Sequence, residues 1–312
     1  MYATVYTPSK ESDTRNCEDG EAAALQIDFH TEQLIRLALA EDIGRGDCTT
    51  MYTVDPALQA RAVVWVKEPS RMAGLPLAER VFHTVDPALQ FTYLAHDGDD
   101  LADRQAVCEI VGKACSILTA ERTALNFLAR LTGIATKTRD AANLIAGTKT
   151  RLLDTRKTTP GWRSIEKYAV AVGGGCNHRH GLDDMVLIKD NHIAMAGGVR
   201  VAIERARAQV GVAQKIEVEV DTLEQLAEAL AAEPDMILLD NMSTSQLAQA
   251  VAMSEGRVTL EASGNMTLSR LPEVAATGVD YISMGALTHA ARSIDVGLDI
   301  EPFTALRMGD QP

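Results

Sequence analysis

The chain has 312 residues, of which 46% are hydrophobic and 23% charged, and its net charge at neutral pH is -13. These values are typical of a soluble globular protein with one large α/β barrel or two ordinary domains. The acidic balance argues against nucleic acid as a general partner, because a phosphate backbone is bound by basic surfaces. No run approaches the roughly 18 apolar residues of a membrane span, so we also expect no membrane partner.

The N-terminal residues and the cysteines indicate the compartment. Residues 1–27 are polar and acidic, and we expect a mobile extension that lacks the apolar region of a secretory signal. The five cysteines are odd in number, widely spread and without a C-x-x-C pair. This pattern argues against a disulfide framework and a zinc ribbon and favours a reducing environment. We therefore expect a cytoplasmic protein.

Residues 28–133 mix helix and strand and predict an N-terminal α/β domain. FHTEQLIRLALAED has helical spacing, and ARAVVWVKE, ALQFTYLAHD and AVCEIVGKA have the character of strands. SILTAERTALNFLARLTG then predicts a helix that ends at Gly133 as its C-cap. At the other end of the chain, residues 291–312 are expected to pack back on this domain.

Residues 134–290 have a more regular pattern. Short apolar runs begin near residues 151, 185, 216, 236, 258 and 281, and helix-like segments lie between them. Thr222 and Ser243 are suitable caps for two of these helices. Strands that alternate with helices in this way predict a parallel sheet, either open or closed into a barrel.

Nearly every predicted strand of this half ends in polar or charged residues. In chain order the strand ends carry Thr155, Arg156 and Lys157; Lys189; Glu219; Asp240; Ser263, Gly264 and Asn265; and Gly285 with Ala286. In a parallel β/α barrel the carboxyl ends of the strands meet at one face, where barrel enzymes have their active sites. The pattern therefore predicts an active site at these strand ends.

Four cations would share this face, namely Arg156, Lys157, Arg179 and Lys189. The window from Lys149 to His192 holds eight Lys/Arg against five Asp/Glu, a net +3 within an acidic chain. A cluster of cations is costly unless an anionic ligand neutralises it. Pairing with Asp154, Asp183 and Asp190 could account for one or two of the cations but not for all four. We therefore expect a small ligand with several negative groups.

Glu219 and Asp240 follow successive strands, with no histidine between them. Two carboxylates of this kind favour a hard cation such as Mg²⁺, which would also bind phosphate oxygens. An acid/base pair of the glycosidase kind is the alternative, but it would not need the cations opposite. The last two strand ends, ASGN and SMGAL, bring glycines whose backbone N–H groups suit a phosphate.

The stretch GGGCNHRHGL over residues 173–182 allows three interpretations. A zinc site formed by Cys176, His178 and His180 would lack a fourth ligand at the usual spacing and would lie beside the positive charge of Arg179. The phosphate-loop interpretation is better served by the last two strand ends. We therefore expect the glycines to end a helix and to turn the chain sharply, so that His178 and Arg179 reach a carboxylate.

Taken together, these motifs resemble those of the quinolinate phosphoribosyltransferases, the carboxylating nicotinate-nucleotide pyrophosphorylases. The resemblance covers about residues 28 to 300 and is carried by LLDTRKTTPGWR, GGGCNHRHGLDD, LIKDNHI, IEVEVDTLEQ, LLDNMS, LEASGN and ISMGALTHAA, with EDIGRGDCTT and ERTALNFLARLTGIAT in the first half. It implies an α/β N-terminal domain followed by an open β/α barrel, the type II phosphoribosyltransferase architecture. It also implies a homodimer in which one subunit completes the active site of the other.

The resemblance further implies the reaction and the role of each residue. Quinolinate and phosphoribosyl pyrophosphate would give nicotinate mononucleotide, CO2 and diphosphate, with Mg²⁺, in NAD biosynthesis. Arg156, His178 and Arg179 would bind the quinolinate carboxylates, together with Arg122 from the partner subunit, and Thr155 lies in the same run. Lys157 and Lys189 would lie between quinolinate and the diphosphate. Glu219 and Asp240 would hold the ribose and Mg²⁺, and Ser263, Gly264, Asn265, Gly285 and Ala286 would bind the 5'-phosphate.

Three other functions remain open at this point. A related phosphoribosyltransferase could act on another pyridine acid, such as nicotinate, without decarboxylation. A Schiff-base aldolase could use Lys157 or Lys189 at a strand end. An anion-binding or scaffold protein would bind phosphoribosyl pyrophosphate without turnover.

Overall fold

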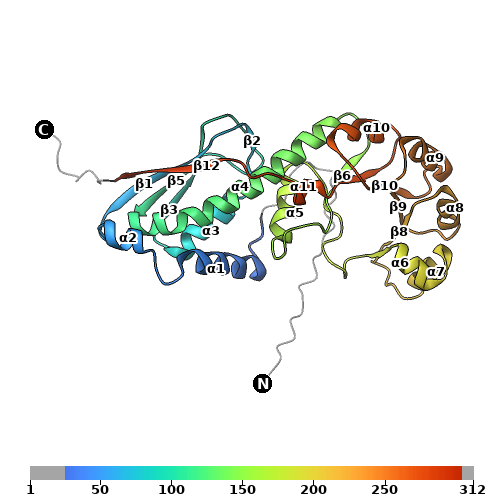
Figure 1. The fold of residues 1–312 in the computed structure, drawn as a ribbon, viewed down its shortest axis with the longest axis horizontal. Coiled ribbons are helices and arrows are strands. Elements are labelled where there is room, and N and C mark those ends of the chain that lie inside the picture. Colours follow the sequence, from blue (N-terminus) through green and yellow to red (C-terminus); the bar gives the residue numbers. More distant parts are fainter. Residues whose placement is uncertain (1–24, 304–312) are drawn as a thin grey trace, which may run out of the picture.

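The computed structural model describes residues 25–303, and these form two domains connected by one long helix (Figure 1). The expected N-terminal extension falls outside the described residues up to residue 24, as does the C-terminal segment after residue 303. Within residues 25–303 we find no helix that is both long enough and apolar enough to cross a membrane.

The N-terminal domain is an antiparallel sheet with helices packed against it. Its main sheet has the order β12-β1-β5-β3, and a small second sheet pairs β2 with β4. The strands are β1 (Gln59–Val66), β2 (Ser70–Arg71), β3 (Gln90–Tyr93), β4 (Asp100–Leu101), β5 (Gln105–Lys113) and β12 (Val296–Pro302). The helices are α1 (Phe29–Ile43), α2 (Cys48–Thr53) and α3 (Leu75–Val85). Alternate residues of β1 are buried, as expected for a sheet with one face on the core.

The C-terminal end of the described chain returns to this first domain. β12 pairs antiparallel with β1, in a register that runs from Ala60 opposite Pro302 to Val66 opposite Val296. The two ends of the described chain therefore contribute to one sheet, and the second domain is inserted between them (Figure 1).

Helix α4 (Ala114–Leu144) connects the domains, and it corrects one prediction. We expected this helix to end at Gly133, but it continues for another 11 residues. A Cβ atom at Gly133 would lie 1.9 Å from the Arg292 carbonyl oxygen. The glycine is thus required by the close approach of another backbone segment and does not end the helix.

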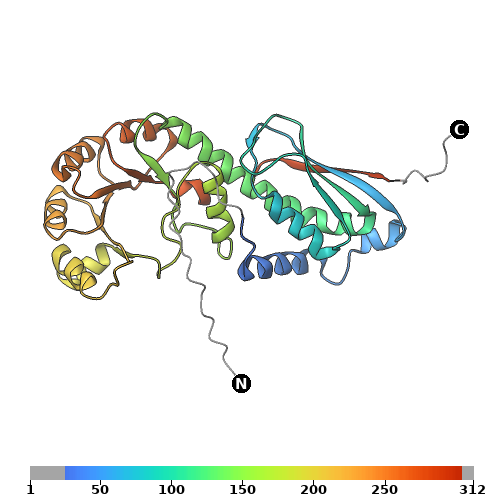
Figure 2. The ribbon, with the colours of Figure 1, turned by 180° about the vertical axis from the view of Figure 1, so that it is seen from behind.

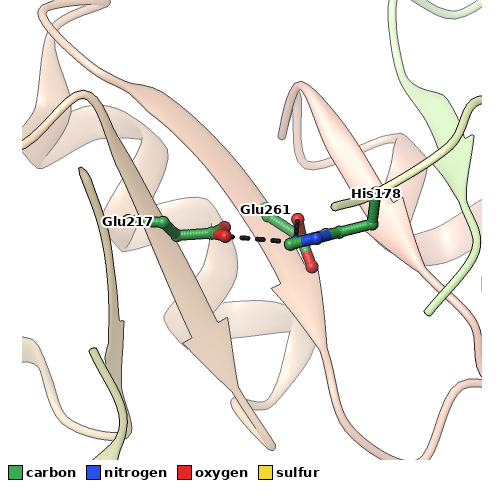
Figure 3. A group of neighbouring side chains, drawn as sticks. All are labelled: His178, Glu217 and Glu261. Atoms are coloured by element: carbon green, nitrogen blue, oxygen red, sulfur yellow. Dashed lines mark ion pairs between the residues drawn. The ribbon is translucent and has the colours of Figure 1, made fainter. Parts of the chain in front are cut away.

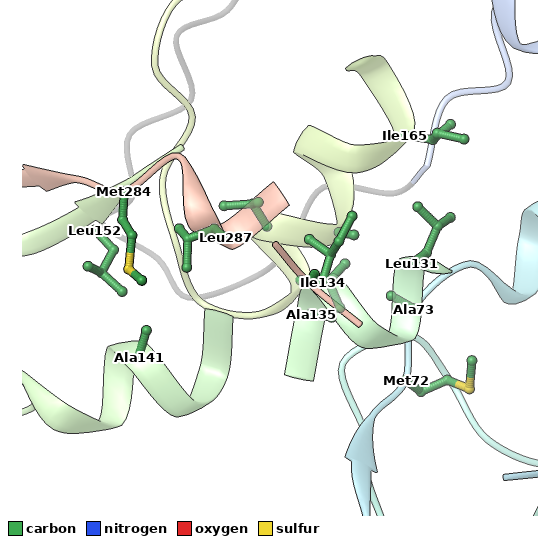
Figure 4. Close-up of a cluster of buried hydrophobic side chains, with 14 of the residues drawn as sticks. Met72, Ala73, Leu131, Ile134, Ala135, Ala141, Leu152, Ile165, Met284 and Leu287 are labelled. Atoms are coloured by element: carbon green, nitrogen blue, oxygen red, sulfur yellow. The ribbon is translucent and has the colours of Figure 1, made fainter. Parts of the chain in front are cut away.

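A continuous apolar core joins the two domains along α4 (Figure 4). Leu131 and Ile134 of α4 are fully buried, and the cluster includes Met72 from the first domain and Leu152 and Leu287 from the second. Burial of side chains on both sides of one helix fixes the position of the barrel relative to the first domain.

The second domain is a curved sheet of parallel strands covered by helices, as the sequence predicted (Figure 2). The strand order is β6-β11-β10-β9-β8-β7. The strands are β6 (Arg151–Leu153), β7 (Val186–Ile188), β8 (Ile216–Val220), β9 (Met236–Asp240), β10 (Thr259–Ser263) and β11 (Tyr281–Ser283). β6 and β7 form the two edges and do not pair with each other, so the barrel is open between them.

The helices of the barrel lie between successive strands. They are α5 (Arg163–Val172), α6 (Asp190–Ala196), α7 (Val199–Arg207), α8 (Leu223–Ala231), α9 (Thr244–Ser254), the 3-10 turn η1 (Leu268–Arg270), α10 (Leu271–Ala275) and α11 (Ala286–His289). The predicted caps are confirmed, because Thr222 accepts a hydrogen bond from the Gln225 amide and Ser243 accepts one from the Gln246 amide. Short helices α6 and α11, which begin directly at strand ends, were not predicted.

Candidate active site

The parallel pairing brings the polar strand ends to one edge of the barrel. Ser263 lies opposite Asp240 in the register of β10 and β9, and Glu219 lies opposite Leu238 of β9. All pairs of neighbouring strands in this sheet are parallel. The carboxyl ends that carry the predicted site residues therefore face the same side of the domain.

The three glycines at residues 173–175 end α5 and bring the chain to the free edge of β6. Gly174 has φ +87°, and an added Cβ at Gly173 would lie 2.5 Å from the Ala135 carbonyl oxygen of α4. Both conditions favour glycine, one for backbone conformation and one for close packing. The chain then forms an isolated parallel bridge between Cys176 and Leu153 of β6, where the Cys176 amide donates to the Leu152 carbonyl at 2.7 Å.

His178 follows this turn, and its ring points into the barrel between two buried glutamates (Figure 3). Its Nε2 lies 3.1 Å from Glu217 Oε2 and 3.3 Å from Glu261 Oε2. Both glutamates are fully buried. The other ring nitrogen, Nδ1, accepts a hydrogen bond from the Arg179 amide at 2.8 Å.

These three side chains are close enough to hold a metal ion, since their ligand atoms lie within 4.8 Å of one another. The hydrogen bond at Nδ1 argues against a metal. A metal-bound Nε2 would require a proton on Nδ1, and that proton would face the Arg179 N–H. The ring instead carries its proton on Nε2, directed at the carboxylates.

The acidic pair strongly shifts the titration of this cluster. Burial disfavours a charged His178 ring, but Glu217 and Glu261 outweigh it and raise the pKa of His178 to about 10. Burial and the charge of Glu261 raise the pKa of Glu217 to about 7. Both shifts mean that the cluster retains an additional proton near neutral pH.

Arg156 and Arg179 form the cationic side of the site. Arg156 is exposed, and its guanidinium makes no hydrogen bond or ion pair within residues 25–303. Arg179 Nη1 donates to the Met185 carbonyl at 3.2 Å, whereas its buried Nε has no partner among the described residues. Burial and the nearby charge of Arg156 lower the pKa of Arg179. Two neighbouring guanidinium groups without a carboxylate between them favour a ligand with negative charge.

The carboxylates of Glu219 and Asp240 lie on adjacent strands at the same edge. Glu219 forms an ion pair with Lys189, and Asp240 accepts a hydrogen bond from the Asn241 side chain at 2.6 Å. Glu219 and Asp240 supply hard oxygen donors at an accessible strand edge, which suits Mg²⁺ because this ion keeps several water or phosphate ligands. The donor set thus fits the expected ion without a histidine or a thiolate.

The two glycine turns at the end of the barrel are tightly built. Gly264 has φ +85°, and an added Cβ would lie 2.2 Å from Asn241 Oδ1. A Cβ at Gly285 would lie 2.8 Å from Lys157 Cδ and 3.3 Å from Thr155 Oγ1. The Gly285 turn is therefore in contact with the loop after β6. Through this contact, Lys157 lies against the predicted phosphate loop.

Comparison with known proteins agrees with this geometry. Residues 134–299 match the family model of the C-terminal domain of quinolinate phosphoribosyl transferase, and residues 47–132 match that of its N-terminal domain. The chain belongs to the quinolinate phosphoribosyl transferase family.

Two curated relatives and one solved structure illustrate the similarity within this family. A probable nicotinate-nucleotide pyrophosphorylase [carboxylating] from Synechocystis sp. is 45% identical over 267 residues, which cover 84% of this chain and 90% of the relative. The protein of the same name from Bacillus subtilis is 40% identical over 86% of this chain and 93% of its own length. The crystal structure of NadC from Streptococcus pyogenes superposes with a TM-score of 0.87 at 40% identity, and covers 90% of this chain and all of that chain. The predicted family and fold are thus confirmed.

One predicted residue lies apart from the others. Arg122 is exposed on α4 and makes no hydrogen bond or ion pair within the described residues. Arg130, two turns further along the same helix, already contacts the barrel through the Thr288 and Ala291 carbonyl oxygens. Arg122 therefore lies on the side of α4 toward the first domain and is separated along the helix axis by about 12 Å from the barrel contact.

Several residues that support the site were not predicted as site residues. They are Asp154, Lys167 and Asn177 around His178, Glu217 and Glu261 beneath it, Arg130, Glu166 and Thr288 behind the Lys157 loop, and Asn241 and Arg270 at the Gly264 turn. For the glutamates a signal was present. IEVEV places Glu217 and Glu219 two residues apart on one face of a strand, so a second carboxylate below the first could have been expected.

Proposed function

We propose that the protein transfers phosphoribose from phosphoribosyl pyrophosphate to quinolinate with decarboxylation, which gives nicotinate mononucleotide, CO2 and diphosphate. It would thus act as a glycosyltransferase of the pentosyl class in pyridine nucleotide and NAD biosynthesis. The observation that carries the proposal is the pair Arg156 and Arg179. The charge of Arg156 is close enough to lower the pKa of Arg179, and neither guanidinium forms an ion pair with a carboxylate among the described residues. Both lie at a barrel edge that also carries Glu219 and Asp240.

The two arginines would bind the carboxylates of quinolinate. A planar guanidinium matches a carboxylate with two parallel hydrogen bonds, and quinolinate offers two carboxylates on adjacent ring carbons. His178 lies beside Arg179, and a contact from its ring to the substrate would replace one of the three contacts that the ring makes here. Arg122 would complete the pocket of a partner subunit, since it is exposed on the first domain.

Phosphoribosyl pyrophosphate would bind along the other strand ends. The backbone of Ser263, Gly264 and Asn265 and that of Gly285 and Ala286 would bind the 5'-phosphate, because glycines at strand ends let a ligand approach the backbone N–H groups. Lys157 contacts the Gly285 turn and Lys189 lies against Glu219, so both ammonium groups are near the expected diphosphate. Thr155 fixes this loop, as its Oγ1 accepts a hydrogen bond from the Lys157 amide at 3.1 Å.

The chemistry follows from these positions. The pyridine nitrogen of quinolinate attacks the anomeric carbon, a C–N bond forms, and the C–O bond to diphosphate breaks with its electron pair on the diphosphate. The transition state resembles an oxocarbenium ion, and the site contributes orientation and preorganised charge. The resulting pyridinium stabilises an electron pair at C2, so the C2–carboxylate bond can break to release CO2. A proton then adds to C2, and no organic cofactor is required.

Mg²⁺ would be held by Glu219 and Asp240 and would neutralise charge on the diphosphate. A homodimer and a cytoplasmic location also stay part of the proposal. The dimer is supported by the position of Arg122, which can serve the site of another subunit better than its own.

The direct test incubates the purified protein with phosphoribosyl pyrophosphate, Mg²⁺ and either quinolinate or nicotinate. We expect nicotinate mononucleotide and CO2 with quinolinate, and little product with nicotinate because one guanidinium would have no carboxylate to bind. Product with nicotinate and none with quinolinate would show that nicotinate is the substrate and overturn the assignment of quinolinate. Borohydride trapping of a carbonyl substrate on Lys157 or Lys189 would support an aldolase, and binding of phosphoribosyl pyrophosphate without turnover would support an anion-binding protein.

A further inference from the structure

A buried carboxylate lies between the two halves of the site. Asp154 directly follows β6, is fully buried, and precedes the run that carries Arg156. Its Oδ1 accepts hydrogen bonds from Lys167 Nζ and from the His178 amide at 2.8 Å. Its Oδ2 accepts one from Asn177 Nδ2 at 2.7 Å. Three donors from two other segments therefore converge on one side chain.

Lys167 completes a clamp around the His178 backbone. This side chain of α5 is 4% exposed, and its ammonium donates both to Asp154 and to the His178 carbonyl, the latter at 2.8 Å. The amide of His178 is thus held by the carboxylate and its carbonyl by the ammonium. Asn177 adds a third connection, because its Nδ2 also donates to the Lys167 carbonyl at 2.9 Å.

The backbone on either side of this clamp is fixed as well. The Cys176 amide donates to the Leu152 carbonyl, and the Asp154 amide donates to the Cys176 carbonyl at 3.1 Å. The segment 176–179 is therefore joined to the end of β6 by backbone and side-chain hydrogen bonds together. Arg156 lies three residues beyond the end of β6, so this joint connects the backbone segments that carry the two arginines.

A buried ion pair of this kind is not expected for stability alone. Burial raises the pKa of Asp154 and lowers the pKa of Lys167, so the charged forms of both groups are disfavoured despite their contact. Apolar side chains of similar volume often stabilise a core equally well. What apolar side chains cannot supply is a set of hydrogen bonds to the peptide groups of His178.

The geometry points to Asp154 and Lys167 as positioning residues that set the distance between the two carboxylate-binding halves of the quinolinate site, Arg156 on one side and His178 with Arg179 on the other. This assignment rests on the function proposed above and adds residues that do not themselves touch the substrate.

The test compares Asp154→Asn, Lys167→Met and the double variant with the wild type. Steady-state rates give KM for quinolinate and for phosphoribosyl pyrophosphate separately, and thermal unfolding gives Tm. A displacement of about 1 Å in a binding group costs on the order of 10²-fold, so we expect both single variants to raise KM for quinolinate by about that factor. KM for phosphoribosyl pyrophosphate should stay within about twofold, because the Gly264 turn, Glu219 and Asp240 make no hydrogen bond or ion pair to the clamp among the described residues. The double variant should resemble the single variants, since the pair acts as one unit.

Asp97→Asn is the matched control. Asp97 also accepts three hydrogen bonds, from the amides of Gly74 and Leu75 and from the hydroxyl of Tyr168, the residue next to Lys167. It joins the first domain to α5 and makes no hydrogen bond to the segment 176–179. This control should lower Tm and leave KM for quinolinate unchanged.

Asn177→Ala keeps the proposal testable if the charge variants do not fold, because it removes two hydrogen bonds and leaves both charged groups of the clamp in place. We expect it to raise KM for quinolinate about tenfold, with KM for phosphoribosyl pyrophosphate unchanged. Equal rises in both KM values, or a rise in the Asp97→Asn control of the same size, would show a general loss of structure and overturn the assignment. An active wild type with unchanged variants would refute the assignment alone, whereas an inactive wild type would refute the proposed function and the assignment with it.

Discussion

Substitution of Gly264 by alanine tests the packing of the proposed phosphate loop. Gly264 has φ +85°, and an L-residue in the left-handed region costs about 1–2 kcal/mol. The new Cβ would also lie 2.2 Å from Asn241 Oδ1 and 2.8 Å from the Asn241 backbone nitrogen. Asn241 cannot move freely, since its amide donates to the Ser263 carbonyl and its Oδ1 accepts from Asn265 Nδ2. Overpacking of this kind costs about 1–3 kcal/mol more.

The expected loss for Gly264→Ala is therefore about 2–5 kcal/mol, which corresponds to a fall in Tm of about 4–20 °C. Gly278→Ala is the matched control. Gly278 has φ +88°, but its added Cβ would meet only Val251 Cγ1, at an ordinary 3.6 Å. The control should cost about 1–2 kcal/mol, or about 2–8 °C, from backbone strain alone.

Thermal unfolding and initial rates at varied phosphoribosyl pyrophosphate measure both effects. Gly264→Ala should lower Tm further than Gly278→Ala and raise KM for phosphoribosyl pyrophosphate at least about tenfold, because the displaced Asn241 adjoins Asp240. Gly278→Ala should leave that KM unchanged. Equal losses of Tm in the two variants, or an unchanged KM in Gly264→Ala, would refute the reasoning.

Four further substitutions test the substrate and metal assignments. Arg156→Ala should raise KM for quinolinate about 10- to 150-fold, the equivalent of the roughly 1.5–3 kcal/mol of a hydrogen bond to a charged group, and an unchanged KM would remove Arg156 from the site. Arg122→Ala and Arg156→Ala proteins, each impaired alone at low quinolinate, should regain partial activity when mixed, because one intact shared site can form per dimer; no recovery despite confirmed subunit exchange would contradict a shared site. Glu219→Gln and Asp240→Asn should each increase the Mg²⁺ concentration needed for half-maximal rate, measured by titration of the ion, and an unaltered Mg²⁺ dependence would place the ion elsewhere.

The sequence predicted the barrel well because each of its units carries a local signal. Apolar runs of four or five residues alternate with helices that begin at good caps, as at Thr222 and Ser243, and the structure follows this pattern. The end of α4 was predicted wrongly. Gly133 is a common C-cap residue in sequence, but here its lack of a side chain accommodates the Arg292 carbonyl, a contact between distant segments. No local pattern contains that information.

The strand-end residues of the site could be predicted for a similar reason. Parallel topology alone places Lys189, Glu219 and Asp240 at one edge. The supporting residues could not be found in this way. Asp154 was considered as a partner for the exposed cations, yet it pairs with Lys167 of α5, and this depends on how the helix packs against β6. Because Asp154 is buried, its charge is paired inside the protein and is not available to the exposed cations of the site.

The fate of the two quinolinate carboxyl groups tests the central claim most directly. The protein would be incubated with phosphoribosyl pyrophosphate, Mg²⁺ and quinolinate labelled with ¹³C in either the 2-carboxyl or the 3-carboxyl group. We predict that the 2-label is released as CO2 in step with diphosphate and that the 3-label is retained in nicotinate mononucleotide. Retention of both labels in the mononucleotide, or release of the 3-label, would contradict phosphoribosyl transfer coupled to decarboxylation at C2.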